Sequence, residues 1–259
     1  RAEWFPPGFL PRVGDKPGVL FFDELNAATP IVQASLYQLI LDRRIGEYQL
    51  PDGWTIVAAG NREEDRSVVF RMPDALANRF VHLEFDVSFD DWRIWATGRK
   101  LHPNVIGFLS IRRELLFKRG EGRSFPTPRS WEMVGDILDA FPSVSAAEEA
   151  VSGTVGVGAA IEFAAFMRDS IALEEIASII ANPAHAELPK KISSLYVLVN
   201  HLARRADEAE IRAVCGSLLL RLPIEFGTLL AKDILRSHPL FVKNTDFKAF
   251  VAKNKEAFR

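Results

Sequence analysis

Two short apolar runs with a helical segment between them place the strongest constraint on how this chain folds. Val19 to Phe22 and Trp54 to Ala59 are almost wholly apolar and rich in aromatic or β-branched residues. Runs of this kind are typical of strands that are covered on both faces. Between them, apolar side chains recur from Val32 at i, i+4, i+7 and i+8, which is one face of a helix. Strand, helix and strand in this order predict an α/β unit with a parallel sheet.

The rest of the chain carries mostly helical signals. A third apolar run, "VHLEF" at residues 81–85, predicts one more strand, and strand signals almost vanish after it. Ser88 is a plausible N-cap for the next helix, and Thr127 is a second N-cap, followed by proline at the first helical position. Residues 144–259 are predicted to be helical throughout, with breaks at prolines.

Composition excludes several classes of protein. The 259 residues are 48% hydrophobic with a net charge of −2, so there is no general electrostatic case for nucleic acid or an anionic membrane. The longest weakly polar stretch, Gly153 to Met167, is shorter than the ~20 residues of a membrane span. The single cysteine, Cys215, excludes an internal disulfide and a cysteine zinc site, and we expect a packed free thiol in a reducing, cytoplasmic setting.

Asp23 and Glu24 directly follow the first apolar run. In open α/β sheets, ligands bind beyond the carboxyl ends of the strands. A strand-final aspartate can hold Mg²⁺ beside nucleotide phosphates, and a glutamate after it can take a proton from an attacking water. The alternative is an exposed pair of acids that caps the next helix.

Asn61 and Arg79 are candidates for the same chemistry. Asn61 follows the second apolar run, where a neutral amide can orient water and donate to a phosphate oxygen; the alternative is an ordinary turn after Gly60. Arg79 can bind phosphate oxygens with its planar guanidinium, and an arginine supplied by a neighbour accelerates phosphoryl transfer by roughly 10³–10⁵. Its alternative is a surface ion pair with Asp74.

Arg129 stands in the first turn of the helix that begins at Pro128, where the helix dipole disfavours a cation. A bound anion would reverse this penalty. The alternative is a contact with Glu132, three residues further along the same helix.

These elements, in this order, resemble the motifs of AAA+ ATPases. "GVLFFDELN" resembles the Walker B strand, "TIVAAGN" the sensor 1 strand, "MPDALANRF" the arginine-finger segment and "FPTPRSW" the start of the sensor 2 helix. The turn "EYQLPDG" resembles the pre-sensor-1 hairpin of the helix-2-insert clade. Within that clade the resemblance is closest to MoxR-like ATPases.

The resemblance implies ATP and Mg²⁺ as cofactors and gives each candidate a role. Asp23 would help to hold Mg²⁺, Glu24 would activate the attacking water, and Asn61 would position that water. Arg79 would reach the γ-phosphate bound by the adjacent subunit, and Arg129 would sense the nucleotide from the lid, in cis or in trans.

The resemblance also implies an architecture and partners. Residues 1–87 would be a partial parallel-sheet P-loop NTPase (AAA+) core, residues 88–143 an all-α lid and residues 144–259 a C-terminal helical extension. The family acts as a homo-oligomeric ring, often a hexamer, that uses ATP hydrolysis to remodel or activate a partner protein. We expect no membrane span and no nucleic-acid partner.

One part of the family pattern is absent from this sequence. A search for G-x-x-x-x-G-K-[ST], the loop whose backbone N–H groups surround the phosphates, finds nothing. In the family this loop precedes Walker B by many tens of residues, whereas 22 residues precede Asp23 here. We therefore expect the C-terminal part of a longer ATPase, which alone binds ATP poorly or not at all. The alternative is a non-catalytic α-helical interaction protein on a degenerate AAA+ scaffold. A DExx-type helicase or nuclease is disfavoured, since no basic aromatic strip is present.

Overall fold

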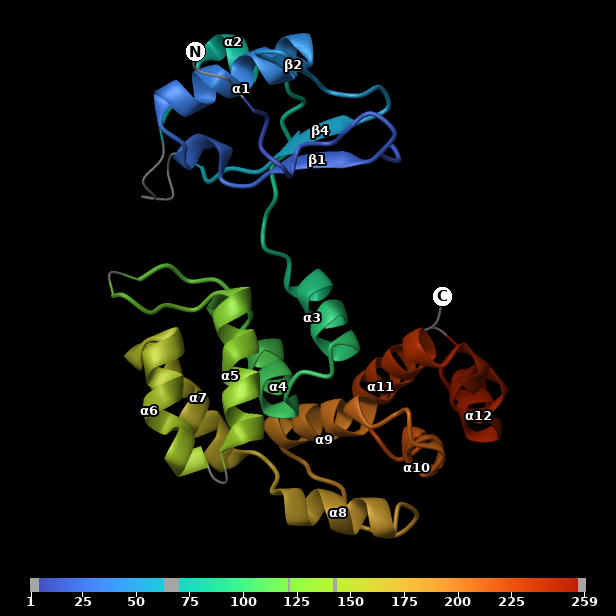
Figure 1. Cartoon of the computed structure of the whole chain (residues 1–259). Helices are drawn as coiled ribbons and strands as arrows, with labels where there is room; N and C mark the ends of the chain where they lie inside the picture. The colour runs from blue at the N-terminus through green and yellow to red at the C-terminus, as the bar shows by residue number, and fades with distance from the viewer. Residues whose placement is uncertain (1–4, 63–69, 121, 142–143, 256–259) are drawn as a thin grey trace. The chain divides into compact units, whose positions relative to one another are not determined.

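The computed structural model describes residues 5–62, 70–120, 122–141 and 144–255 (Figure 1). The chain is mostly helical and contains a small two-stranded parallel sheet. It divides into two compact units, residues 1–85 and 86–259, and each is described by itself below. Among the described residues, no helix is both long and apolar enough to cross a bilayer.

The first unit is built on a strand–helix–strand motif, as predicted. Strands β1 (Val19–Phe22) and β4 (Thr55–Ala58) pair in parallel, with Val19 opposite Thr55 and Phe22 opposite Ala58. The other elements of this unit are η1 (Leu25–Ala27), α1 (Pro30–Asp42), the hairpin strands β2 (Arg44–Ile45) and β3 (Tyr48–Gln49), and α2 (Asp74–Ala77).

The sheet of the first unit is covered on one face. Leu20 of β1 and Leu39 of α1 are buried together in a small core, and α1 lies against the sheet in Figure 1. Since successive strand residues point to opposite faces, the alternate residues of the same strands share the other face. There Val19, Phe21 and Val57 are 58%, 54% and 42% exposed. Parallel sheets are normally covered on both faces, so this sheet has one uncovered apolar face.

The predicted third strand at residues 81–85 is wrong. The segment is assigned to no strand, and Val81, Leu83 and Phe85 are 87%, 87% and 95% exposed. A strand is stable only when its backbone pairs with a neighbour. Within the described residues, β1 and β4 pair with each other and not with this segment. The alternating apolar residues are present, but no segment that the structure describes pairs with them.

The second unit is wholly helical in its described part, which confirms the predicted change of pattern. Its N-caps are also confirmed: Ser88 Oγ accepts from the backbone N–H of Asp91 at 3.3 Å, and Thr127 Oγ1 accepts from that of Ser130 at 3.0 Å. The elements are α3 (Phe89–Gly98), α4 (Pro103–Ile111), η3 (Arg113–Leu115), α5 (Pro128–Ala140), α6 (Val144–Val155), α7 (Val157–Asp169), α8 (Leu173–Ala181), α9 (Ile192–Arg204), α10 (Ala209–Leu219), α11 (Ile224–Ser237), η4 (Pro239–Lys243) and α12 (Thr245–Lys253).

Two apolar cores hold these helices. The first, formed by α3 to α7, centres on Phe108, Trp131 and Phe163, whose ring centroids lie 5.2–5.6 Å apart. This core therefore contains residues from both sides of the predicted domain boundary between residues 143 and 144. Residues 142 and 143 themselves lie outside the described ranges. The second core, formed by α8 to α12, buries Cys215 completely and raises the pKa of its thiol to about 12. The predicted packed free thiol is confirmed.

A buried ion pair joins three of the helices. Arg93 of α3 donates to both carboxylate oxygens of Asp233 on α11, at 3.0 and 2.6 Å, and to the side-chain oxygen of Asn200 on α9 at 3.4 Å. The Asp233 side chain is fully buried. Because an unpaired buried charge is costly, each of these helices constrains the position of the other two.

Candidate functional site

The two strands of the parallel sheet end side by side, and this brings three of the predicted site residues to one edge. Phe22 and Ala58 are paired at the last position of the ladder. The backbone contact continues beyond it, since Ala59 donates to the carbonyl of Phe22 at 2.8 Å and Leu25 donates to the carbonyl of Ala59 at 2.9 Å. Asp23 and Glu24 lie within this extension, and Asn61 follows it by two residues.

Asn26 ties the two strand ends together. Its amide nitrogen donates to the carbonyl of Asn61 at 2.6 Å, and its amide oxygen accepts from the N–H of Asn61 at 3.1 Å. A Cβ at Gly60 would lie 2.6 Å from that amide oxygen, so glycine is needed there for the close approach. The residue pattern does not single out Asn26, because its partners are backbone groups of Asn61, 35 residues away.

The two acids after β1 are exposed and held by a local hydrogen bond. Asp23 Oδ1 accepts from the backbone N–H of Glu24 at 3.0 Å. Glu24 has φ 52° and ψ 38°, the left-handed conformation, which is uncommon for a residue other than glycine. Backbone strain of this kind costs of order 1–3 kcal/mol and clusters at functional sites. The conformation turns the chain sharply, directly after the strand.

The donor set at this edge fits a cation that brings other ligands with it. No group of three or more His, Cys, Asp or Glu side chains within the described ranges could hold a metal ion unaided. Mg²⁺ is commonly held by one or two carboxylates together with water and substrate phosphates. Asp23, with one oxygen engaged by a backbone N–H and an exposed side chain, fits that role.

A cavity of about 350 Å³ opens beside the end of β4. Its wall includes Asn26, Asn61, Ala77, Phe80 and His82. Asp23 and Glu24 are outside this wall, so the cavity meets the candidate site at Asn61 and not at the carboxylates. Its volume is at the lower end of the range of small-molecule sites.

Arg79 is exposed and follows α2 between two residues that line this cavity. The alternative partner considered for it, Asp74, instead pairs with Arg71 at 3.2 Å. In the part of the chain that the structure describes, the Arg79 guanidinium takes part in no ion pair and no hydrogen bond. It is therefore available to an acceptor outside this unit.

Arg129 belongs to the second unit, whereas the other four candidates belong to the first. It lies at the second position of α5, directly after the capped end, and its side chain is exposed. Glu132, the alternative partner, pairs with Arg99 at 3.5 Å instead. Within the described residues Arg129, like Arg79, has no ion-pair partner.

Comparison of the chain with family models, with curated proteins and with solved structures gives no match.

Proposed function

We propose that this chain is part of a MoxR-like AAA+ ATPase that couples ATP hydrolysis to the remodelling or activation of a partner protein. The observation that carries the proposal is the juxtaposition at the sheet edge. Asp23 and Glu24 follow one parallel strand, Asn61 follows the next, and Asn26 bridges the two ends. Carboxyl ends of adjacent parallel strands are where α/β proteins bind nucleotides.

In this proposal each residue uses the chemistry that its side chain has. Asp23 holds Mg²⁺, which neutralises phosphate charge when bound. Glu24 accepts a proton from the attacking water at its carboxylate, and Asn61 orients that water through its amide. The left-handed backbone at Glu24 and the bridge from Asn26 supply the fixed positions that such a site needs.

In this proposal Arg79 and Arg129 both bind phosphate oxygens of the nucleotide, Arg79 from a neighbouring subunit and Arg129 from the lid. Arg79 is exposed and unpaired among the described residues, as an arginine that serves the nucleotide of a neighbouring subunit must be. A head-to-tail interface of that kind closes into a ring, here a homo-oligomer in the cytoplasm. Arg129 stands at a helix N-terminus, which itself favours a bound phosphate, and that phosphate would offset the unfavourable position of the cation.

The uncovered face of the β1–β4 sheet also supports the proposal. Val19, Phe21 and Val57 are exposed on that face, and residues 81–85 have strand-like alternation but pair with no strand among the described residues. A complete NTPase core would add a phosphate loop together with its strand and the helix that follows it. Such additions would cover apolar residues that are exposed here.

The first test is Glu24→Gln in the complete gene product. We expect ATP turnover to fall by about 10²–10⁴, the contribution of a general base, while nucleotide binding persists because the amide keeps the shape of the site. The control is Glu47→Gln, an exposed glutamate of the same unit at the β2–β3 turn. Unchanged turnover in Glu24→Gln would refute the assigned base.

The second test is Arg79→Ala, with Arg71→Ala as its control, since Arg71 is an exposed arginine of the same segment. Arg79→Ala should lose hydrolysis by roughly 10³ and keep nucleotide binding. Mixing it with Glu24→Gln protein tests supply in trans, because mixed rings contain some interfaces with both native residues. Equal loss of binding and hydrolysis contradicts the role.

The missing phosphate loop favours a second candidate, a non-catalytic interaction protein on a degenerate AAA+ scaffold. The two proposals differ in one measurement. The complete gene product binds Mg²⁺-ATP if the first is right and shows no nucleotide binding by calorimetry if the second is right.

A further inference from the structure

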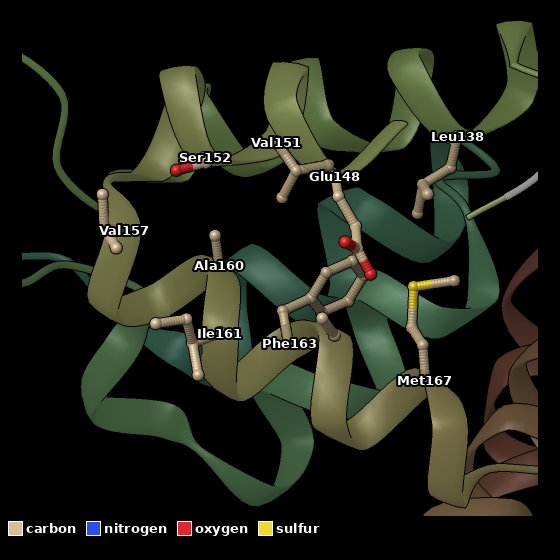
Figure 2. A pocket seen from close by; sticks show the side chains of 10 residues that line it. Leu138, Glu148, Val151, Ser152, Val157, Ala160, Ile161, Phe163 and Met167 are labelled. Atoms are coloured by element: carbon tan, nitrogen blue, oxygen red, sulfur yellow. The ribbon is translucent and has the colours of Figure 1, made fainter. Parts of the chain in front are cut away.

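The second unit contains an apolar pocket that the proposed nucleotide chemistry does not use. It has a volume of about 170 Å³ and opens between α6 and α7, with one residue from α5 (Figure 2). Its main lining side chains are small or apolar: Val151, Ser152, Ala160, Phe163, Ala164 and Met167. An engineered cavity of about 150 Å³ is large enough to bind benzene, so this pocket has room for one ring or one branched aliphatic group.

The pocket has a fixed floor. Phe163 is 2% exposed, and its ring lies 5.2 Å from that of Phe108 and 5.6 Å from that of Trp131. Gly156 alone joins α6 and α7, at φ +82°, and a Cβ there would lie 2.8 Å from the carbonyl oxygen of Ser124. Closely packed aromatic rings and a one-residue connection leave the walls little freedom to collapse.

A single carboxylate stands at the mouth of this apolar pocket. Figure 2 shows the Glu148 side chain extending from α6 toward Phe163, and Glu148 lines the pocket. Glu148 is half exposed, and its ion pair with Arg168 is long, with Nη1 and Oε1 3.6 Å apart. A carboxylate at the opening attracts a cation attached to the bound group and repels an anion.

The apolar lining of the pocket extends to exposed side chains. Val157 and Ile161 belong to the lining, lie one turn apart on α7 and are 66% and 62% exposed. One ring over Phe163 would cover only part of these two side chains. A polypeptide whose anchor side chain enters the pocket would cover them as well, as buried anchors and their surroundings do in protein interfaces.

We propose that this pocket binds the anchor side chain of a partner polypeptide, a phenylalanine or leucine, with a lysine or arginine next to it at Glu148. The apolar group fills the pocket over Phe163, and the cation lies at the carboxylate. The site identifies the partner by this pair of side chains. It is independent of the strand-end residues, so each of the two proposals can fail without the other.

The test uses capped dipeptides as probes and methyl NMR of the whole chain as the readout. Capped phenylalanyl-lysine should shift the methyl signals of Ala160, Ala164 and Met167 in a saturable manner. Capped alanyl-lysine, which lacks the anchor, should cause no shift. Capped phenylalanyl-glutamate, with the charge reversed, should bind at least about tenfold more weakly than phenylalanyl-lysine.

Variants separate the anchor from the charge. Ala164→Phe fills the pocket from α7 and should abolish binding; Ser152→Phe fills it from α6 and does the same if the first variant fails to fold. Glu148→Gln should weaken phenylalanyl-lysine about tenfold and leave neutral capped phenylalanine amide unchanged. The matched control is Glu149→Gln, the next residue on α6, which is exposed and outside the lining.

Several outcomes overturn the proposal. It is wrong if no probe shifts the three methyl signals, if the filled variants bind as the native chain does, or if phenylalanyl-glutamate binds as tightly as phenylalanyl-lysine. Toluene binding as tightly as phenylalanyl-lysine would show a small apolar cavity without a polypeptide site, and would also refute it.

Discussion

The sheet of residues 5–85 and the helices of residues 86–255 bury their apolar side chains to different extents. In the first unit a small core lies on one side of two strands, and Val19 and Phe21 on the other side are more than half exposed. In the second unit two large cores enclose side chains such as Trp131 completely. A helix completes its backbone hydrogen bonds alone, whereas a parallel sheet needs neighbours at its edges and on both faces. The second unit is therefore the more self-sufficient of the two.

The largest effect is expected at the buried ion pair of the second unit. Asp233→Ala leaves the Arg93 guanidinium buried without its carboxylate, which should cost about 3–5 kcal/mol of unfolding free energy. Hydrogen exchange, followed peptide by peptide, reports the two units separately. The control is Glu187→Ala, whose pair with Lys190 is almost fully exposed and should matter by less than about 0.5 kcal/mol. Equal protection loss in both variants would contradict the assigned role of the pair.

The second prediction compares the two faces of the sheet. Leu39→Ala removes a side chain that is 1% exposed and should destabilise the first unit by about 2–5 kcal/mol. Phe21→Ala, on the uncovered face, should change stability by less than about 0.5 kcal/mol. Urea unfolding of the two variants measures the contrast. If the complete gene product covers that face, Phe21→Ala should lower its free energy of unfolding by more than this. The size of that loss measures how far Phe21 is buried in the complete protein.

The third prediction concerns acid and the second unit. Burial lowers the pKa of His102 to about 4, against the opposing charge of Asp139, while Arg204 and His201 lower it further. The unfolded chain has a pKa near 6.5 and therefore binds the proton first. The contribution of neutral His102 to the free energy of unfolding is complete above pH 6.5. It falls between pH 6.5 and pH 4, by at most about 1.4 kcal/mol per pH unit.

His102 also caps α4 by accepting from the N–H of Asn104 at 3.3 Å. His102→Asn keeps a good capping residue and should flatten the pH dependence of the unfolding free energy between pH 4 and 6.5. His185→Asn, at an exposed histidine of the same unit, should leave the slope as it is. An unchanged slope in His102→Asn would assign the acid sensitivity elsewhere.

The smallest effect is expected at the strand ends. In Gly60→Ala the new Cβ would lie 2.6 Å from Asn26 Oδ1 and displace the amide that joins the strands. Losing these hydrogen bonds should cost about 1 kcal/mol and speed hydrogen exchange at Asn61. The same change at Gly8, which has no neighbour within 4 Å, should alter neither.

Local patterns predicted much of this fold, and contacts between distant residues account for what was missed. The strand–helix–strand order and the caps at Ser88 and Thr127 depend on neighbouring residues, and they are confirmed. Residues 81–85 have a strand pattern, but a strand also needs a partner that the pattern does not supply. The bridge from Asn26 spans 35 residues and involves backbone groups of Asn61, so no local signal reveals it.

The candidate site could be predicted only as a set of residue types. The expectation that Asp23, Glu24 and Asn61 would share a sheet edge follows from parallel pairing, and the register places them there. Their roles in catalysis, and those of Arg79 and Arg129, depend on phosphates and on neighbouring subunits. These are contributed from outside the described residues, so their roles stay predictions.

The reactivity of Cys215 reports the opening of the second unit. As the only cysteine of the chain, buried in α10 with its pKa raised to about 12, it reacts with a thiol reagent only when the surrounding helices open. Its labelling rate under native conditions thus measures how often the second unit opens. The first unit contains no cysteine and therefore adds nothing to the signal. In Phe21→Cys the new thiol would react rapidly, because Phe21 is exposed. A slower labelling rate at that thiol would show that polypeptide covers this face of the sheet.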